Sequence, residues 1–157
     1  MELYHASKEI VQYPEIRKTK YTKDFSWGFY CTNNMNQAIR WANRGIGEPI
    51  INYYEYVPTE NLKILRFPEI SDEWLDFIAE CRSGKTHTYD IVEGPMENDT
   101  VWNYVNDFLA GRITRRQFWV LAEFKYPTHQ ISFHTLSAID CLTFMKREEV
   151  YDRTRKK

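Results

Sequence analysis

The order in which short strand-like and helix-like segments follow one another constrains the fold of this chain most. Apolar, β-branched and aromatic runs predict strands at 2–6, 28–32, 50–57, 62–67, 89–95, 129–135 and 142–151. Helical spacing behind capping residues predicts helices at 34–44, 71–82, 101–109, 114–126 and 137–142. The two kinds of segment do not alternate regularly, which excludes a doubly wound parallel sheet. We expect an α+β fold of small antiparallel sheets, in which 50–57 and 62–67 form a hairpin.

The length and charge of the chain narrow its class. Its 157 residues predict a single domain over 1–157, of which about 152–157 form a basic tail. The net charge of −1 gives no global field towards nucleic acid. The three cysteines form no CxxC, and the histidines have no recognised metal spacing, so we expect no metal site. Because no run is long enough to span a membrane and no signal-peptide pattern is present, we expect a cytoplasmic protein without a membrane partner.

Two short motifs place a His and a Tyr on separate predicted strands. LYHAS (3–7) puts His5 on the first strand, WGFYCT (27–32) puts Tyr30 on the second, and Trp41 follows 11 residues later on a helix. A His nitrogen can hydrogen-bond a ribose hydroxyl, and two aromatic faces can sandwich a planar pyridinium ring. The residues therefore fit a nicotinamide pocket without the GxGxxG fingerprint, which the chain lacks. The alternative is that each is an ordinary core residue.

Together these motifs resemble the His-Tyr-Glu class of ADP-ribosyltransferases, which includes diphtheria-type toxins and poly(ADP-ribose) polymerases. In the diphtheria-type members the strand motif reads Gly-Phe-Tyr-x-Thr, with a second aromatic 11 residues after the Tyr. The matching positions here, with Trp in place of the second Tyr, are Gly28, Phe29, Tyr30, Thr32 and Trp41. The first-strand motif, usually Tyr-His-Gly-Thr, reads Tyr-His-Ala-Ser at 4–7.

The whole chain looks still more like a bacterial family of uncharacterised domains assigned to that superfamily. Its members carry LYHGS, DFGxGFYxT, a YDxVxGPxADD-like segment and a QISFHT-like strand. The corresponding segments here are 3–7, 24–32, 89–100 and 130–135. The resemblance implies the toxin of a toxin–antitoxin pair, with a macromolecular acceptor and a small antitoxin partner.

The resemblance also implies a fold and a set of NAD-binding residues. The fold is that of an ADP-ribosyltransferase, in which small sheets form a central cleft with flanking helices. His5 would contact a ribose hydroxyl, the backbone of Ala6 would bind the carboxamide, and Tyr30 and Trp41 would stack on the nicotinamide. The implied NAD-binding set is His5, Ala6, Gly28, Tyr30, Thr32 and Trp41.

The third catalytic position departs from the superfamily pattern. The superfamily has a Glu that stabilises the positive charge on the ribose as nicotinamide leaves, whereas Gln130 takes that position here. An amide can orient the ribose but supplies no negative charge. Glu93, which precedes the turn at Gly94, is the first candidate for a replacement carboxylate. The alternative is that Glu93 is a solvated loop residue.

Arg17, in the loop before the second strand, is a candidate for the NAD pyrophosphate because a guanidinium group matches phosphate geometry. The alternative is a solvated charge run.

The sequence thus predicts an NAD-dependent mono-ADP-ribosyltransferase. The departure at Gln130 leaves a second hypothesis, a catalytically weak or inactive module that binds NAD or a protein partner. A nuclease-like toxin is a weaker hypothesis, because paired acids and a His with metal spacing are not visible.

Overall fold

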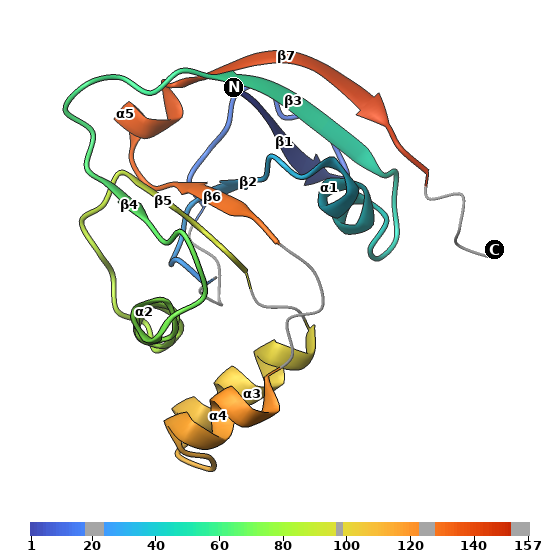
Figure 1. Ribbon diagram of the computed structural model, residues 1–157. Helices are drawn as coiled ribbons and strands as arrows, with labels where there is room; N and C mark the ends of the chain where they lie inside the picture. The colour runs from blue at the N-terminus through green and yellow to red at the C-terminus, as the bar shows by residue number, and fades with distance from the viewer. Residues whose placement is uncertain (18–23, 97–98, 123–127, 152–157) are drawn as a thin grey trace.

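Two small β-sheets that share a core form the centre of the fold, and helices cover their other faces (Figure 1). The computed structural model describes residues 1–17, 24–96, 99–122 and 128–151. Within these residues it contains seven strands and five helices. The predicted α+β class is therefore confirmed.

The first sheet has the strand order β1-β3-β7 and is antiparallel throughout. Its strands are β1 (Glu2–Ser7), β3 (Ile50–Tyr56) and β7 (Leu142–Glu149). The central strand is β3, and all of its residues except Glu55 are buried. Strand β1 occupies one edge of β3 and β7 occupies the other, so β3 has no edge left for a further strand.

The second sheet has the order β2-β6-β5-β4. Its strands are β2 (Phe29–Cys31), β4 (Ile64–Arg66), β5 (Ile91–Gly94) and β6 (Gln130–Phe133). The predicted hairpin between 50–57 and 62–67 is wrong, because both edges of β3 are taken and β4 joins this other sheet. The expectation of purely antiparallel sheets is wrong at one pair, because β4 and β5 run parallel.

The helices lie close to the predicted ranges, but one begins at Asp99 rather than at 101, and the last spans Leu136–Ile139 rather than 137–142. They are α1 (Met35–Ala42), α2 (Asp72–Arg82), α3 (Asp99–Leu109), α4 (Arg115–Leu121) and α5 (Leu136–Ile139). The Ser71 side chain accepts a hydrogen bond from Trp74 N, and Thr114 and Gln117 form a capping box. Helix α4 ends at Leu121, and residues 123–126 of the predicted helix lie outside the described residues.

Alternation along the strands divides the apolar residues between separate cores. Residues of both sheets, among them Leu3, Tyr54, Ile131 and Phe133, pack between the sheets. On the other face of the second sheet, Val92 packs with residues of α2, α3 and α4. Helix α1 packs against the outer face of the first sheet. Leu3 thus faces one core while Tyr4 and Ala6 face another, as the strand period predicts.

A two-bond bridge joins the two sheets at β1 and β2. Tyr4 N donates to Thr32 O over 2.8 Å, and Thr32 N donates to Tyr4 O over 2.9 Å. The first strand of one sheet is thereby held beside the edge strand of the other. The bridge thereby brings His5, the residue after Tyr4, close to Tyr30, two residues before Thr32.

A second connection ties α1 to the beginning of β6. The Gln37 side chain is almost fully buried, and its amide forms two hydrogen bonds with the backbone of His129. Gln37 Nε2 donates to His129 O over 2.6 Å, and His129 N donates to Gln37 Oε1 over 3.0 Å. The amide therefore satisfies both backbone groups of the residue that precedes Gln130.

Replacing Gln37 by Ala should destabilise the protein, because it leaves two backbone groups of His129 without their partner. We expect a loss of about 1–3 kcal/mol in the free energy of unfolding, measured by urea denaturation at pH 7. Asn36→Ala is the matched control, since this neighbouring amide on α1 is exposed. Equal urea midpoints for the two variants would contradict the assigned role of Gln37.

Candidate functional site

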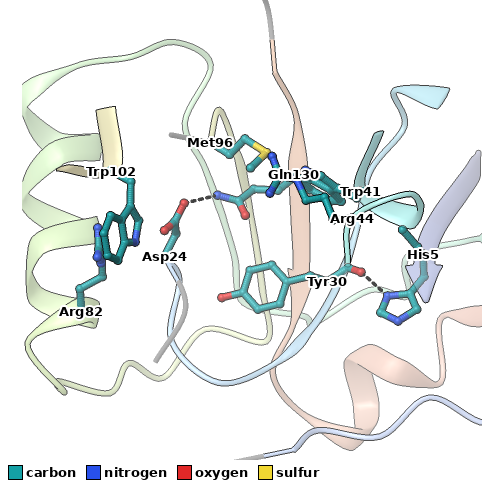
Figure 2. Close-up of a pocket in the computed structure, with 10 residues that line it drawn as sticks. His5, Asp24, Tyr30, Trp41, Arg44, Arg82, Met96, Trp102 and Gln130 are labelled. Carbon is teal, nitrogen blue, oxygen red and sulfur yellow. Dashed lines mark hydrogen bonds between the residues drawn. The ribbon is translucent and has the colours of Figure 1, made fainter. Parts of the chain in front are cut away.

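A cavity of about 410 Å³ lies where the two sheets meet. Five of the residues that line it were predicted from the sequence, namely His5, Ala6, Tyr30, Trp41 and Gln130. The others are Asp24, Arg44, Arg82, Met96 and Trp102 (Figure 2). The volume is within the range of small-molecule sites, roughly 300–1,000 Å³.

The register of the second sheet explains which residues face this cavity. Tyr30 lies opposite Ser132 on β6, and Gln130 lies opposite Gly94 on β5. Because opposed residues share a face and the side-chain period is two, Tyr30 and Gln130 point to the same side of the sheet. The intervening Ile131 points to the other side, into the core between the sheets.

His5 connects the two strands that carry the predicted motifs. Its Nδ1–H donates to Tyr30 O over 2.6 Å, since a carbonyl oxygen can only accept (Figure 2). Its ring stacks on Phe29 with the centroids 4.1 Å apart. The hydrogen bond sets the tautomer, so Nε2 of the neutral ring is an acceptor.

The hydroxyl of Tyr30 is committed to the backbone beneath the cavity. It donates to Ser26 O over 2.6 Å and accepts from Phe25 N over 3.0 Å. Burial first, and then the nearby Asp24 carboxylate, raise the pKa of the Tyr30 phenol well above its usual value. Tyr30 therefore remains a neutral phenol, and it offers the cavity an aromatic ring rather than an acid or base.

Gln130 is buried, and its amide is oriented by an acidic neighbour. Gln130 Nε2 donates to Asp24 Oδ2 over 3.2 Å, with Pro95 O at 3.5 Å (Figure 2). Asp24 was not predicted from the sequence as a site residue, although it is the first residue of the matched segment 24–32, DFSWGFYCT. The structure thus places a carboxylate in contact with Gln130, the residue that the sequence resemblance aligns with the catalytic Glu.

The structure does not bring Glu93 to this cavity. Glu93 lies opposite Ile131 and so points to the other face of the sheet from Gln130. There His129 Nε2–H donates to Glu93 Oε2 over 2.8 Å, and Arg66 lies 3.4 Å from Oε1. The hydrogen bond from His129 holds the pKa of the Glu93 carboxyl below its usual value, against the effect of burial. The turn at Gly94 does not redirect Glu93 inward, because the β5–β6 register extends through that turn.

Arg17 and Gly28 line a second, smaller cavity of about 190 Å³. His5 and Tyr30 line both cavities, so the two adjoin. Arg17 is exposed and lies 3.4 Å from Glu15. The cations of the first cavity are instead Arg44 and Arg82.

Arg82 is the last residue of α2, and Arg44 lies two residues after the end of α1. Arg44 lies three residues after Trp41, a spacing that could have suggested it from the sequence. Arg82 lies over the ring of Trp102, 4.7 Å from its centroid, and donates to Asn106 Oδ1 over 2.7 Å. Arg82 and Trp102 place positive charge and a second Trp on the wall formed by α2 and α3.

Thr32 and Gly28 support the strand rather than line the first cavity. Thr32 is fully buried, and its Oγ1 accepts a hydrogen bond from Asn34 N at the start of α1. A Cβ at Gly28 would lie 2.8 Å from His134 Nδ1 and 2.9 Å from Phe133 O. Glycine is therefore needed at this position for close packing of β2 on β6.

Two half-buried histidines hold the backbone of the turn between Asp24 and Gly28. His134 Nδ1–H donates to Trp27 O over 2.8 Å, and His134 Nε2 accepts from the Ser132 hydroxyl at 2.7 Å. His87 Nε2–H donates to Phe25 O over 2.8 Å. Burial lowers the pKa of His87, and it lowers the pKa of His134 to about 4. Both rings are therefore neutral at pH 7.

A family model described as "Protein of unknown function (DUF3990)" matches residues 1–144. The chain belongs to the DUF3990 family. Neither a curated protein nor a solved structure matches it. The match spans every residue of this DUF3990 member that lines the two cavities.

Two further findings concern the described part of this DUF3990 member. No helix in it is long and apolar enough to cross a membrane. Among the same residues, no group of three or more His, Cys, Asp or Glu side chains could hold a metal ion.

The half-buried His134 should make folding stability depend on pH. Its pKa is lower in the folded chain than the usual 6.5, so the unfolded chain binds more protons between pH 6.5 and about 4. Stability from this group is complete above pH 6.5 and falls by about 3 kcal/mol as the pH drops to about 4. His134→Gln keeps an N–H donor but removes the titrating ring. It should therefore flatten the dependence of the free energy of unfolding on pH between pH 6.5 and 4, measured by urea denaturation.

The slope should flatten rather than vanish in this variant. His87 remains, and its pKa is lowered in the same direction. A variant that kept the wild-type slope over this pH range would contradict the role assigned to His134.

Proposed function

We propose that this chain is an NAD-dependent mono-ADP-ribosyltransferase that binds the nicotinamide ring of NAD between Tyr30 and Trp41. The observation that supports this most is that one cavity gathers five residues from four separate segments of the chain. They are His5 and Ala6 on β1, Tyr30 on β2, Trp41 on α1 and Gln130 on β6. These are the elements in which the ADP-ribosyltransferase motifs were found in the sequence.

The chemistry of the lining suits a planar ring attached to a sugar. Tyr30 provides a neutral aromatic ring that its buried hydroxyl holds in place. Trp41 provides a second large aromatic surface. In the proposed complex the backbone of Ala6 binds the carboxamide, and His5 accepts a hydrogen bond from a ribose hydroxyl through Nε2.

The remainder of NAD extends from the nicotinamide ribose past His5. The second cavity adjoins the first at His5 and Tyr30, which suits a ligand with two lobes. Arg44 and Arg82 in the first cavity, and Arg17 in the second, provide the guanidinium groups that attract a pyrophosphate. We assign the adenosine half to the second cavity.

In the reaction, the bond between nicotinamide N1 and ribose C1′ breaks and its electron pair leaves with nicotinamide. A nucleophile on a macromolecular acceptor then attacks C1′ and loses its proton. A role as the toxin of a pair, restrained by a small antitoxin, belongs to the same proposal and follows from the sequence resemblance.

A second candidate function is a catalytically weak or inactive module that binds NAD or a protein partner. The observation that favours it is the buried, uncharged Gln130 at the third catalytic position. Release of nicotinamide from NAD by the wild-type chain separates the two functions, because only an enzyme breaks the glycosidic bond.

Trp41→Ala should weaken NAD binding by about tenfold, because it removes one aromatic face from the nicotinamide. The dissociation constant is measured by isothermal titration calorimetry. Trp119→Ala is the control, since Trp119 lies on α4 outside the cavity and donates its indole N–H to Asp72. Circular dichroism checks that both variants are folded. No NAD binding by the wild-type chain at millimolar concentration would refute the proposed function.

A further inference from the structure

We propose that Asp24 supplies the negative charge that Gln130 cannot, and that Gln130 positions Asp24 against the reacting ribose. This inference rests on the proposed function and names its missing catalytic group. It replaces Glu93, the candidate from the sequence, by a residue from a different segment of the chain.

The first support is the location of Asp24. Its carboxylate accepts a hydrogen bond from Gln130 Nε2 at 3.2 Å, and Figure 2 shows the two groups directed at each other. Asp24 is the single carboxylate among the described residues that line the cavity. It also lies close enough to Tyr30 to influence that phenol. A ligand ring placed against Tyr30 therefore has this charge beside it.

The second support is the way in which the turn after Asp24 is fixed. Three polar side chains, the buried Tyr30 and the half-buried His87 and His134, hold four of its backbone groups. The groups held are Phe25 N, Phe25 O, Ser26 O and Trp27 O. Ser26 adopts a φ of 78°, which is uncommon for a residue with a side chain. Such fixing is what a charge needs if it is to stabilise a transition state without reorganising.

The chemical step balances with the groups present. The N1–C1′ bond of NAD breaks, and its electron pair neutralises the departing nicotinamide. Positive charge develops on C1′ and the ring oxygen of the ribose, where the Asp24 carboxylate stabilises it. The acceptor's nucleophilic atom forms the new bond to C1′, and its proton passes to Asp24 and then to water. The products are ADP-ribosyl acceptor, nicotinamide and one proton.

The test is an exchange of the carboxylate and the amide. Asp24→Asn should lower kcat for nicotinamide release by about 100-fold or more, because it removes one fixed electrostatic contact with the transition state. The NAD dissociation constant should stay within a few fold of the wild-type value. Gln130→Glu should not raise kcat above wild type, because it puts two carboxylates in contact. The double variant Asp24→Asn/Gln130→Glu again has one carboxylate and one amide. Its kcat should be at least tenfold higher than that of Asp24→Asn.

Glu69→Gln, at an exposed position, is the control for removing a surface carboxylate. Wild-type kcat in Asp24→Asn would overturn the inference while leaving the proposed function intact. If Asp24→Asn lowers the melting temperature, the double variant is used to decide. A double variant that is folded and binds NAD but releases no nicotinamide overturns the inference. A wild-type chain that binds no NAD overturns the proposed function, and the inference with it.

Discussion

The pair of backbone hydrogen bonds between Tyr4 and Thr32 is the connection on which the site depends. Each sheet is small, and the cavity lies between residues of both. The bridge fixes β1 beside β2, and from there His5 reaches the carbonyl of Tyr30. Together with the core that the two sheets share, it sets the separation between the His and Tyr motifs. Because the contact is made by main-chain atoms, it holds the strands together whatever side chains they carry.

Buried and half-buried polar side chains of this chain act mainly on the backbone. Gln37, Asn52, His87 and His134 all bond to main-chain groups of other segments. Asn52, for example, accepts from Val11 N and donates towards Glu9 O, which holds the segment after β1 at the edge of the second cavity. Such contacts satisfy groups that secondary structure leaves unpaired. The loops around the cavities are therefore held by specific bonds although they have little regular structure.

Local features of the fold could be read from the sequence, and distant pairings could not. The caps at Ser71 and Thr114 depend on residues three positions apart, so a short window is enough to find them. The parallel pairing of β4 with β5 joins residues 27 positions apart, such as Ile64 and Ile91, that no local rule connects. For the site, the strand period is enough to place His5 on the same face of β1 as Leu3. To predict where Glu93 points, one would need the register of β5 on β6. To predict where Asp24 lies, one would need the shape of a turn with a positive φ at Ser26.

The clamp of Gln37 on His129 has a consequence for how related sequences can vary. Both bonds end on main-chain atoms, so the clamp would accept any residue type other than proline at position 129. At position 37 the same clamp needs a side chain with a donor and an acceptor at the right reach, which only a glutamine amide provides there. The constraint on variation therefore falls on the helix rather than on the strand that it holds. In a chimera of related chains, an α1 that carries Gln37 can therefore hold the start of β6 from another member whenever position 129 is not proline.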